Sequence, residues 1–588
     1  MVALETLDYA IIIGFFATTL IVGLLVAKKS GKSSSEYFLS GRNMPWWLLG
    51  ISMWSTTFST DTPNLVTDIV RNQGVSGNWV WWAFLLTGML TVFVYAKLWR
   101  RSEVLTDLEF YELRYSGKEA AFLRGFRAIY LGVFFNVMIM ASVCLAAIKI
   151  GGILFDLQPW QSVVYASLIT VFYSSIGGLR GVIFTDFLQF IIAMVGSIWA
   201  AIYIINLPEV GGLENLLSHE NVSNKLHFLP NFKDTKTLWT LLIIPIAVQW
   251  WSVWYPGAEP GGGGYIAQRM LSAKDEKNAI GATLLFNIAH YAIRPWPWIL
   301  IALASLILYP TLGDISNEFP NATAGHDLGY SAMLTHLPSG LLGLVVTSLI
   351  AAFMSTISTH LNWGSSYISL DFYKRFIKPE ASEKQLVSVG RLSTVILMVL
   401  SALLALQFES ALSTFNILLQ IGAGTGLIFI LRWFWWRVNA YSEITGMVVS
   451  FVVALSFEFY DFTLEDHEKL LWGVGITTFS WIFVTLITPA TQTETLARFY
   501  NKVTPYGMGW NPFRRILGEK GIQLKKSHDQ FTLDLGSMLS GVLFVYTFLF
   551  ATGYLLYGNY LGALILFGVA FVAAWVIFSL WKKKKPRK

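Results

Sequence analysis

The chain has 588 residues, of which 54% are hydrophobic and only 13% are charged, and its formal net charge is +6. A soluble domain carries about a quarter charged residues, so this composition excludes an ordinary soluble globular protein. Because the basic residues are scattered among short connections between apolar segments, the positive charge predicts a membrane orientation and no nucleic-acid partner.

Hydrophobic segments long enough to cross a bilayer recur along the whole chain and predict an all-α polytopic membrane protein. No polar block is long enough for a soluble domain, so residues 1–588 are expected to form one transmembrane domain. About fifteen spans are expected, at residues 8–27, 45–69, 78–97, 126–150, 159–179, 182–206, 238–269, 279–309, 339–371, 389–407, 411–431, 440–460, 468–489, 536–556 and 559–581.

The first span lacks the basic flank and cleavage site of a signal peptide, and it is expected to remain as the first helix. If the N-terminus lies outside, nearly all connections on the inner side are basic and those on the outer side are acidic. This asymmetry predicts a plasma-membrane protein with its N-terminus outside and its C-terminus in the cytoplasm. Few long tails and a single cysteine, Cys144, favour a bacterial inner membrane.

Cys144 excludes a disulfide within the chain and any multi-cysteine metal site. It lies in an apolar run, which is typical of a small buried side chain. The inner connection at 490–535 is amphipathic and basic, and it is expected to pack on the membrane surface or against the bundle.

Two predicted spans contain residues that a lipid-facing helix does not tolerate. The second carries seven hydroxyl residues between Ser52 and Pro63, and the seventh carries two prolines in 255–260 followed by glycines at 261–264. A polar, interrupted span usually marks a cavity or a binding site. The two breaks lie five spans apart, so they cross the membrane in opposite directions, as in inverted repeats. Two independent proline kinks are the alternative.

Four motifs in the chain resemble those of the sodium:solute symporter family, which includes bacterial proline, sugar and sialic-acid symporters. The motifs are YFLSGR at 37–42, GGLRGVIFTDFLQ at 177–189, QRMLSAK at 268–274 and AAFMSTIST at 351–359. The resemblance covers roughly residues 8–460 and implies a secondary active transporter that couples sodium to a small organic solute by alternating access.

The resemblance also implies a LeuT-type fold of two inverted five-helix repeats. These repeats are expected at 45–206 and 238–431, with a leading helix at 8–27 and about four trailing helices at 440–581.

Ala352, Ser355 and Thr356 share one helix face because they are spaced i, i+3 and i+4. Hydroxyl and carbonyl oxygens suit a hard cation. The resemblance implies that sodium binds the side chains of Ser355 and Thr356 and the backbone oxygens of Ala352, Ser55 and Phe58. The alternative is that these hydroxyl groups simply join two helices.

The resemblance places Asp186 near the inner exit of sodium. A carboxylate in the first turn of a helix, stabilised by the helix dipole, is the alternative interpretation. Sodium is the only metal expected, as the coupling ion, and no cofactor is expected.

The two broken segments are expected to supply the solute site, together with a charged residue inside the eighth span. An ionisable group in a span is costly and indicates a function or a partner. Either Asp61 or Glu259 neutralises Arg294, or the acids hold an amine and Arg294 holds a carboxylate, which suits an amino acid or an organic acid. The proposed set is Thr57, Asp61, Thr62, Glu259, Gly263, Tyr265 and Arg294.

Two neighbouring features are given plainer interpretations. His290, one turn before Arg294, is expected to be a packed histidine, and the tryptophans at 79–82 either wall a cavity or mark an interfacial belt. Sugar carriers of the family have an Asn–Gln pair just ahead of Gln268, where this chain has glycines. Sugar or polyol symport therefore stays as the alternative, as does a solute sensor of the same fold.

An enzyme is not expected, because the eight histidines are dispersed and no cluster of acid, base or metal-binding residues is evident. A channel fits the paired broken helices less well than a two-gate transporter. The expected partners are the solute, sodium and the lipid bilayer, with no obligate protein partner.

Overall fold

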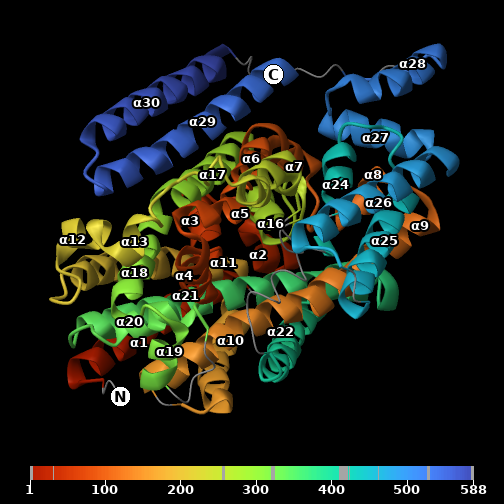
Figure 1. Ribbon diagram of the computed structural model, residues 1–588. Helices are drawn as coiled ribbons and strands as arrows, with labels where there is room; N and C mark the ends of the chain where they lie inside the picture. Colours follow the sequence, from red (N-terminus) through yellow and green to blue (C-terminus); the bar gives the residue numbers. More distant parts are fainter. Residues whose placement is uncertain are drawn as a thin grey trace.

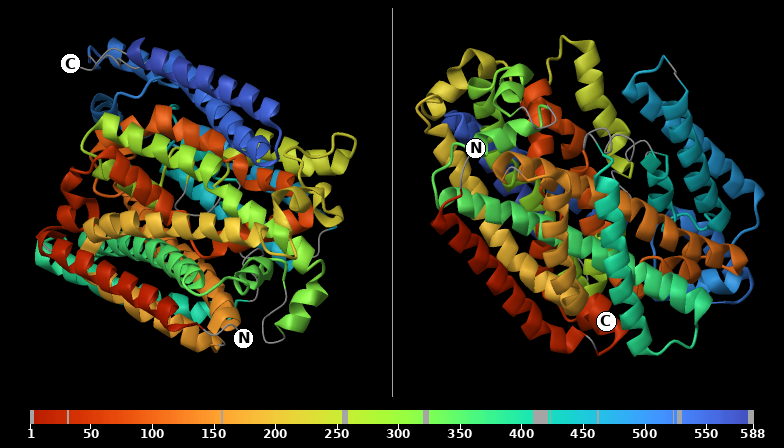
Figure 2. Two further views of the ribbon diagram at one scale, coloured as in Figure 1. Left: turned by 90° about the vertical axis from the view of Figure 1, so that its left-hand side faces the viewer. Right: turned by 90° about the horizontal axis from the view of Figure 1, so that it is seen from below.

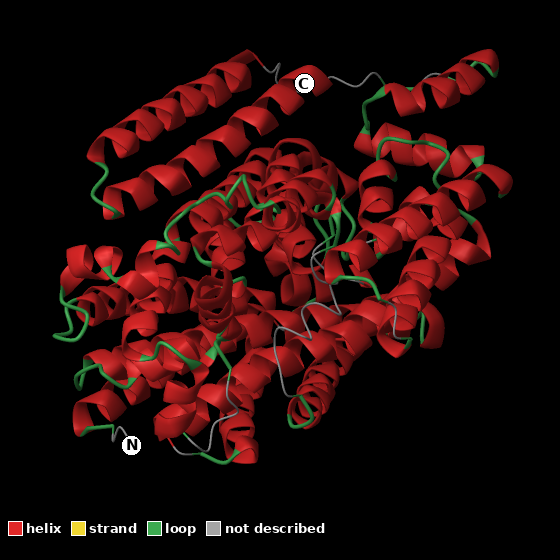
Figure 3. Ribbon diagram, in the orientation of Figure 1, coloured by secondary structure: helices red, strands yellow, loops and turns green. Residues whose placement is uncertain are grey.

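The computed structural model describes residues 4–30, 32–155, 157–253, 259–319, 325–408, 421–422, 424–460, 463–522, 524–525 and 530–583. Within these ranges the chain folds into helices joined by loops, and no strand is drawn (Figure 3). The segment 254–258 of the predicted break and most of the predicted span at 411–431 lie outside the described residues.

The helices follow one another with short connections. In the first part of the chain they are α1 (Thr6–Ser30), α2 (Ser34–Leu39), α3 (Trp46–Thr56), α4 (Asp61–Gln73), α5 (Trp79–Trp82), α6 (Leu85–Leu90), α7 (Ala96–Ser102), α8 (Glu109–Arg114), α9 (Gly117–Ile129), α10 (Asn136–Phe155) and α11 (Pro159–Ile205). In the middle part they are α12 (Gly212–Ser218), α13 (Glu220–Ser223), α14 (Thr235–Leu238), α15 (Ile244–Ala247), α16 (Gly264–Ser272), α17 (Glu276–Ile288), α18 (Pro295–Leu308), α19 (Leu312–Glu318), α20 (Leu328–Leu334), α21 (Leu341–Ser366), α22 (Glu383–Ala405) and α24 (Gly426–Leu431). The last part holds α25 (Ala440–Phe459), α26 (Asp466–Ile487), α27 (Thr493–Val503), α28 (Asn511–Glu519), α29 (Phe531–Leu556) and α30 (Tyr560–Lys583).

Eleven helical stretches of the described residues are long and apolar enough to cross a membrane. Several of them are longer than single helices because π-helical turns join their parts, as η7 (Ala289–Ile293) joins α17 to α18 and η8 (Tyr367–Ile377) extends α21. Four predicted spans are not among the eleven. Two of these are interrupted, one is the first half of α11, and one lies largely outside the described residues.

The interruptions fall where the sequence predicts them. The second span is divided into α3 and α4, with the non-helical residues Thr57–Thr60 between them. The seventh is divided into the short α14 and α15 and then α16, which begins only at Gly264. Gly261 and Gly262 precede α16 with φ of 84° and 91°, a region that side chains with a Cβ rarely adopt.

The predicted spans at 159–179 and 182–206 both lie in α11, a stretch of 47 residues made of two helices that meet at Gly178. It is kinked at Gly178, where φ is 56° and ψ is −166°. A Cβ atom at this position would lie 2.8 Å from the carbonyl oxygen of Tyr37, so α11 and α2 approach each other more closely than any other residue would allow.

The most deeply buried span is the one formed by α21 and η8, and the most exposed is α30. Figure 1 shows α30 at the edge of the molecule. α21 packs against α1, α10, α11 and α22, and the buried Cys144 of α10 lies in this core. Figure 2 shows α29 and α30 as an antiparallel pair on the outside of the bundle. Lys97 of α7 and Asp534 of α29 form a buried ion pair of 2.5 Å that attaches this pair to the bundle.

The amphipathic connection at 490–535 contains α27 and α28. The apolar residues Leu496, Phe499, Phe513 and Leu517 of these helices are buried in one cluster with Trp433. The segment therefore packs against the bundle, which was one of the two expected placements.

Candidate functional site

The break between α3 and α4 leaves main-chain oxygens without helical partners. Phe58 N–H donates to the oxygen of Ser55 at 3.1 Å. The hydroxyl of Thr356, from α21, donates to the oxygen of Thr56 at 2.9 Å and to that of Phe58 at 3.4 Å. Thr356 and the broken segment thus bring several oxygens together, as the coordination of a hard cation requires.

The remaining predicted sodium residues lie beside this point. Ser55 is the penultimate residue of α3, and Ala352 is buried one turn before Thr356. Ser355 is directed to a neighbour of a different kind, because its hydroxyl donates to Oδ1 of Asp186 at 2.6 Å.

Asp186, on α11, is fully buried and connects three further elements. Its Oδ2 accepts from the hydroxyl of Ser52 at 2.5 Å and lies 3.7 Å from Nη2 of Arg269. Arg269 is itself fully buried and donates to the hydroxyl of Thr359 at 2.8 Å. Arg269 belongs to the QRMLSAK motif at 268–274, but it was not among the site residues predicted from the sequence.

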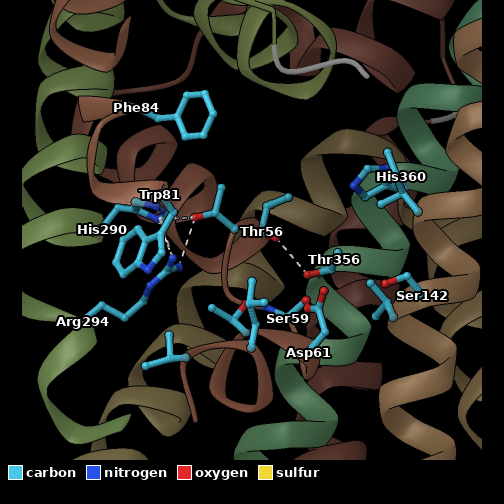
Figure 4. A pocket seen from close by; sticks show the side chains of 16 residues that line it. Thr56, Ser59, Asp61, Trp81, Phe84, Ser142, His290, Arg294, Thr356 and His360 are labelled. Atoms are coloured by element: carbon cyan, nitrogen blue, oxygen red, sulfur yellow. Dashed lines mark hydrogen bonds between the residues drawn. The ribbon is translucent and has the colours of Figure 1, made fainter. Parts of the chain in front are cut away.

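A cavity of about 160 Å³ lies next to these oxygens. Four of the predicted solute residues line it: Thr57, Asp61, Thr62 and Arg294. Trp81, for which the sequence left open a cavity wall or an interfacial belt, also lines it. Sequence reasoning did not select the other polar and aromatic side chains of its wall, which include Ser59, Phe84, Ser142, His290 and His360. Figure 4 shows Arg294 and His290 on one side of the cavity and Thr356, Ser142 and His360 on the other.

Arg294 is held in the cavity wall by neutral groups. Its Nη1 donates to the oxygen of Trp54 at 3.3 Å and to the hydroxyl of Thr57 at 3.2 Å. Its Nη2 lies 2.5 Å from Nδ1 of His290, and the guanidinium lies over the ring of Trp298. Of the two acids suggested as its partner, Glu259 is paired with Arg127 instead, and Asp61 lines the same cavity without an ion pair to Arg294 within 4.0 Å.

The residues predicted from the second break lie elsewhere. Glu259 is buried with Arg127 of α9, Gly263 immediately precedes α16, and Tyr265 is fully buried in α16. None of these three is among the residues that line the cavity. Their distance from it could not be predicted, because the pairing of Glu259 with Arg127 depends on how α9 packs.

A second hollow of about 600 Å³ adjoins the cavity and shares Leu65 and Trp81 with it. It is also lined by Asp68 of α4 and by Glu465 and Asp466 before and in α26, residues of connections predicted to face outward. We refer to it as the vestibule. Leu65 and Trp81 are therefore the side chains that separate the vestibule from the cavity.

Comparison with known proteins identifies the family. The chain matches the sodium:solute symporter family over residues 37–450, more than half of its length. It is 24% identical to a sodium/glucose cotransporter of Vibrio parahaemolyticus, covering 82% of this chain and 91% of the relative. It is 26% identical to the human sodium/myo-inositol cotransporter 2, covering 83% of this chain and 76% of the relative.

The fold agrees with that of a solved structure of a sodium-coupled symporter. A sodium-coupled sialic acid symporter in a substrate-bound, outward-open state superposes with a TM-score of 0.67 at 21% identity, covering 83% of this chain and 99% of the other. The predicted LeuT-type fold is confirmed, whereas the exact limits of the two repeats stay a prediction. The chain belongs to the sodium:solute symporter family, and it is a sodium-coupled solute transporter and not an enzyme.

Proposed function

We propose that the protein imports a polyhydroxylated small solute, a sugar or a polyol, together with sodium. The relatives that transport glucose and myo-inositol support this class of solute. The cavity also suits it, since hydroxyl groups of Thr57, Ser59 and Ser142 offer hydrogen bonds while the rings of Trp81 and Phe84 offer apolar faces.

The observation that carries the proposal is the contact of Thr356 with the carbonyl oxygens of the broken second span. We place sodium there, among the side chains of Ser355 and Thr356 and the backbone oxygens of Ala352, Ser55 and Phe58. Asp186 then lies on the inner side of the ion, where it assists sodium release.

Sodium at this point joins the break between α3 and α4 to α21 and favours a conformation in which the vestibule leads to the cavity. Displacement of Leu65 and Trp81 admits the solute. Release to the inside requires the buried pair of Arg127 and Glu259 to separate, because it closes the opposite side. The orientation that fits this cycle has the N-terminus outside and the C-terminus in the cytoplasm, in a plasma membrane such as a bacterial inner membrane.

A second candidate is an amino acid or an organic acid. It is favoured by the presence of a buried cation, Arg294, and a carboxylate, Asp61, in the same cavity wall. Asp61 Oδ1 is buried and has no hydrogen-bond partner, which leaves it available for an ammonium or a hydroxyl group.

The sodium site is tested by Thr356→Val, which removes one hydroxyl group and keeps the shape of the side chain. The sodium concentration that gives half-maximal thermal stabilisation of the purified protein should rise by about tenfold or more, since a charge-assisted contact is lost. The matched control is Thr347→Val in the same helix, whose hydroxyl bonds only to Gly343 of its own helix, at 2.7 Å. If the Thr356 variant responds to sodium as the native protein does, the proposed sodium site is wrong.

The solute class is tested by adding sugars, inositols and amino acids in sodium and in potassium. We expect stabilisation in sodium by a polyhydroxylated compound. Stabilisation by an amino acid without hydroxyl groups would support the second candidate instead.

A further inference from the structure

Arg294 is a buried cation that has no carboxylate of the described residues within 4.0 Å, although Asp61 lines the same cavity. Its exposed fraction is 1%, and its bonds go to a main-chain oxygen, a hydroxyl group and an imidazole. Its Nε is buried and has no hydrogen-bond partner. A charge placed so deep in a membrane protein is costly unless it is paired.

Four other buried arginines of the described chain are paired with a carboxylate. The partners within 4.0 Å are Asp371 for Arg124, Glu259 for Arg127, Asp186 for Arg269 and Glu443 for Arg432. Arg71 and Arg114 instead donate to several main-chain oxygens. Arg294 differs from all of these because it lines the cavity, so an anion could reach it from there.

His290 strengthens this distinction. An arginine can only donate hydrogen bonds, so the short contact with Nη2 of Arg294 makes Nδ1 of His290 an acceptor. The imidazole is then neutral and carries its proton on Nε2. Arg294 and His290 together provide N–H donors at the cavity wall, a combination that suits a carboxylate.

The opposite part of the wall suits the rest of such a solute. Asp61 Oδ1 and the hydroxyl of Ser59 provide acceptors for hydroxyl groups. The indole N–H of Trp81 is already used, because it donates to Asn78 at 2.8 Å, and its ring therefore contributes an apolar surface.

We propose that the transported solute carries a carboxylate that binds Arg294 and His290, so that it is an acidic sugar rather than a neutral one. This inference rests on the proposed function and specifies the solute of the same site.

The experiment compares pairs of compounds that differ only at one carbon: galactose with galacturonate, and glucose with glucuronate. Thermal stabilisation of the purified full-length protein is measured in sodium and in potassium. We expect the acid of a pair to stabilise the protein in sodium and the neutral sugar to require at least about tenfold more ligand. Because this comparison uses the native protein, it does not depend on the folding of a variant.

Arg294→Gln should abolish the preference for the acid, whereas Arg294→Lys should keep part of it, since the charge remains but the fork of donors is lost. Lys236→Gln is the matched control. Lys236 is exposed at the predicted outer face and is paired with Glu465 at 2.7 Å, so its loss removes the same charge without touching the cavity.

Equal stabilisation by a neutral sugar and its acid would overturn the inference, as would an Arg294→Gln variant that still prefers the acid. A wider panel of uronates, aldonates and amino acids in which no carboxylate stabilises the protein in sodium would overturn it too. An amino acid that stabilises would support the carboxylate contact and contradict the polyhydroxylated solute. If sodium alone has no effect on the native protein, the sodium site of the proposed function fails, independently of Arg294.

Discussion

Asp186 shows how a single residue connects the parts of the site. It accepts hydrogen bonds from Ser52 of α3 and Ser355 of α21 and faces Arg269 of α16, so four elements meet at one carboxylate. A buried charge of this kind is stabilising only while its partners remain in place. Movement of α3 against α21 therefore changes the environment of Asp186 directly.

Replacing Asp186 by asparagine removes the negative charge opposite Arg269. We expect the free energy of unfolding to fall by roughly 3–5 kcal/mol, because the guanidinium of Arg269 stays buried without its anion. Ser52→Ala leaves both charges in place and removes one hydrogen bond to the carboxylate and two that the hydroxyl accepts from Arg269, so it should lower the free energy of unfolding by about 1–3 kcal/mol. The melting temperatures of the two variants in detergent provide the comparison. A Ser52 variant that is less stable than the Asp186 variant would contradict this assignment of the charge.

At the residue scale, the sequence pattern identified the hydroxyl residues Ser355 and Thr356 but not the groups that each of them contacts. The spacing of Ser355 and Thr356 places both on one face, yet only Thr356 contacts the broken segment while Ser355 bonds to Asp186. Such a division depends on the rotation of α21 against α3, which spacing alone does not specify. The sequence predicts a packed histidine at 290 and leaves Trp81 open between a cavity wall and an interfacial belt, because nothing local distinguishes a packed ring from one that lines a cavity.

Among the elements, the course of α11 depends on the kink at Gly178. Gly178 adopts φ and ψ that are essentially restricted to glycine, and it lies against Tyr37 of α2. The kink sets the direction in which the second half of α11 carries Asp186 toward α21.

Gly178→Ala should lower the melting temperature clearly, since the strained backbone alone costs on the order of 1–3 kcal/mol and the new Cβ would lie 2.8 Å from a main-chain oxygen. Gly181→Ala, one turn later in the same helix, is the matched control because nothing lies within 4 Å of its added Cβ. Its expected effect is neutral or slightly stabilising, as alanine is the better helix former. Equal melting temperatures for both variants would show that the kink is not required.

Element prediction succeeded where polarity and proline interrupt an apolar run, as between α3 and α4. The separation of 159–179 from 182–206 is also confirmed, because Gly178 has φ and ψ outside the helical region and divides α11 into two helices. The packing of α2 against this glycine is a tertiary effect that hydropathy does not reveal.

On the scale of the whole molecule, a buried ionic cluster joins helices that are far apart in the sequence. Arg127 of α9 pairs with Glu259 ahead of α16, and its guanidinium lies over the rings of Tyr111 and Phe429. The nearby pair of Arg432 and Glu443, at 3.5 Å, extends this contact to α25. Both predicted repeats and a trailing helix are thereby held together.

A double-mutant cycle on Arg127→Gln and Glu259→Gln measures the coupling energy between these two side chains. Each single substitution should lower the free energy of unfolding by roughly 3–5 kcal/mol. The double substitution should lower it by less than the sum of the two single losses, because no unpaired charge remains. The exposed pair of Lys236 and Glu465 is the control, with an expected coupling below about 1 kcal/mol. Additive losses at Arg127 and Glu259 would mean that the two side chains do not act as a pair.

The predicted orientation counts Arg127, Arg269 and Arg432 among the basic residues of the inner side. The structure buries all three beside carboxylates. A count of this kind cannot recognise such residues, since a buried arginine and an exposed one are identical in a sequence and differ only in what packs around them.

The position of Cys144 also makes this transporter convenient for spectroscopy. The chain contains one thiol, and it is fully enclosed in a cluster with residues of α1, α21 and α22. Water-soluble maleimides therefore find no accessible sulfur on the folded native protein. A cysteine introduced at the rim of the vestibule, for example at Asn72, would be the sole labelled position, so fluorescent or spin probes could follow its opening without removal of the native residue.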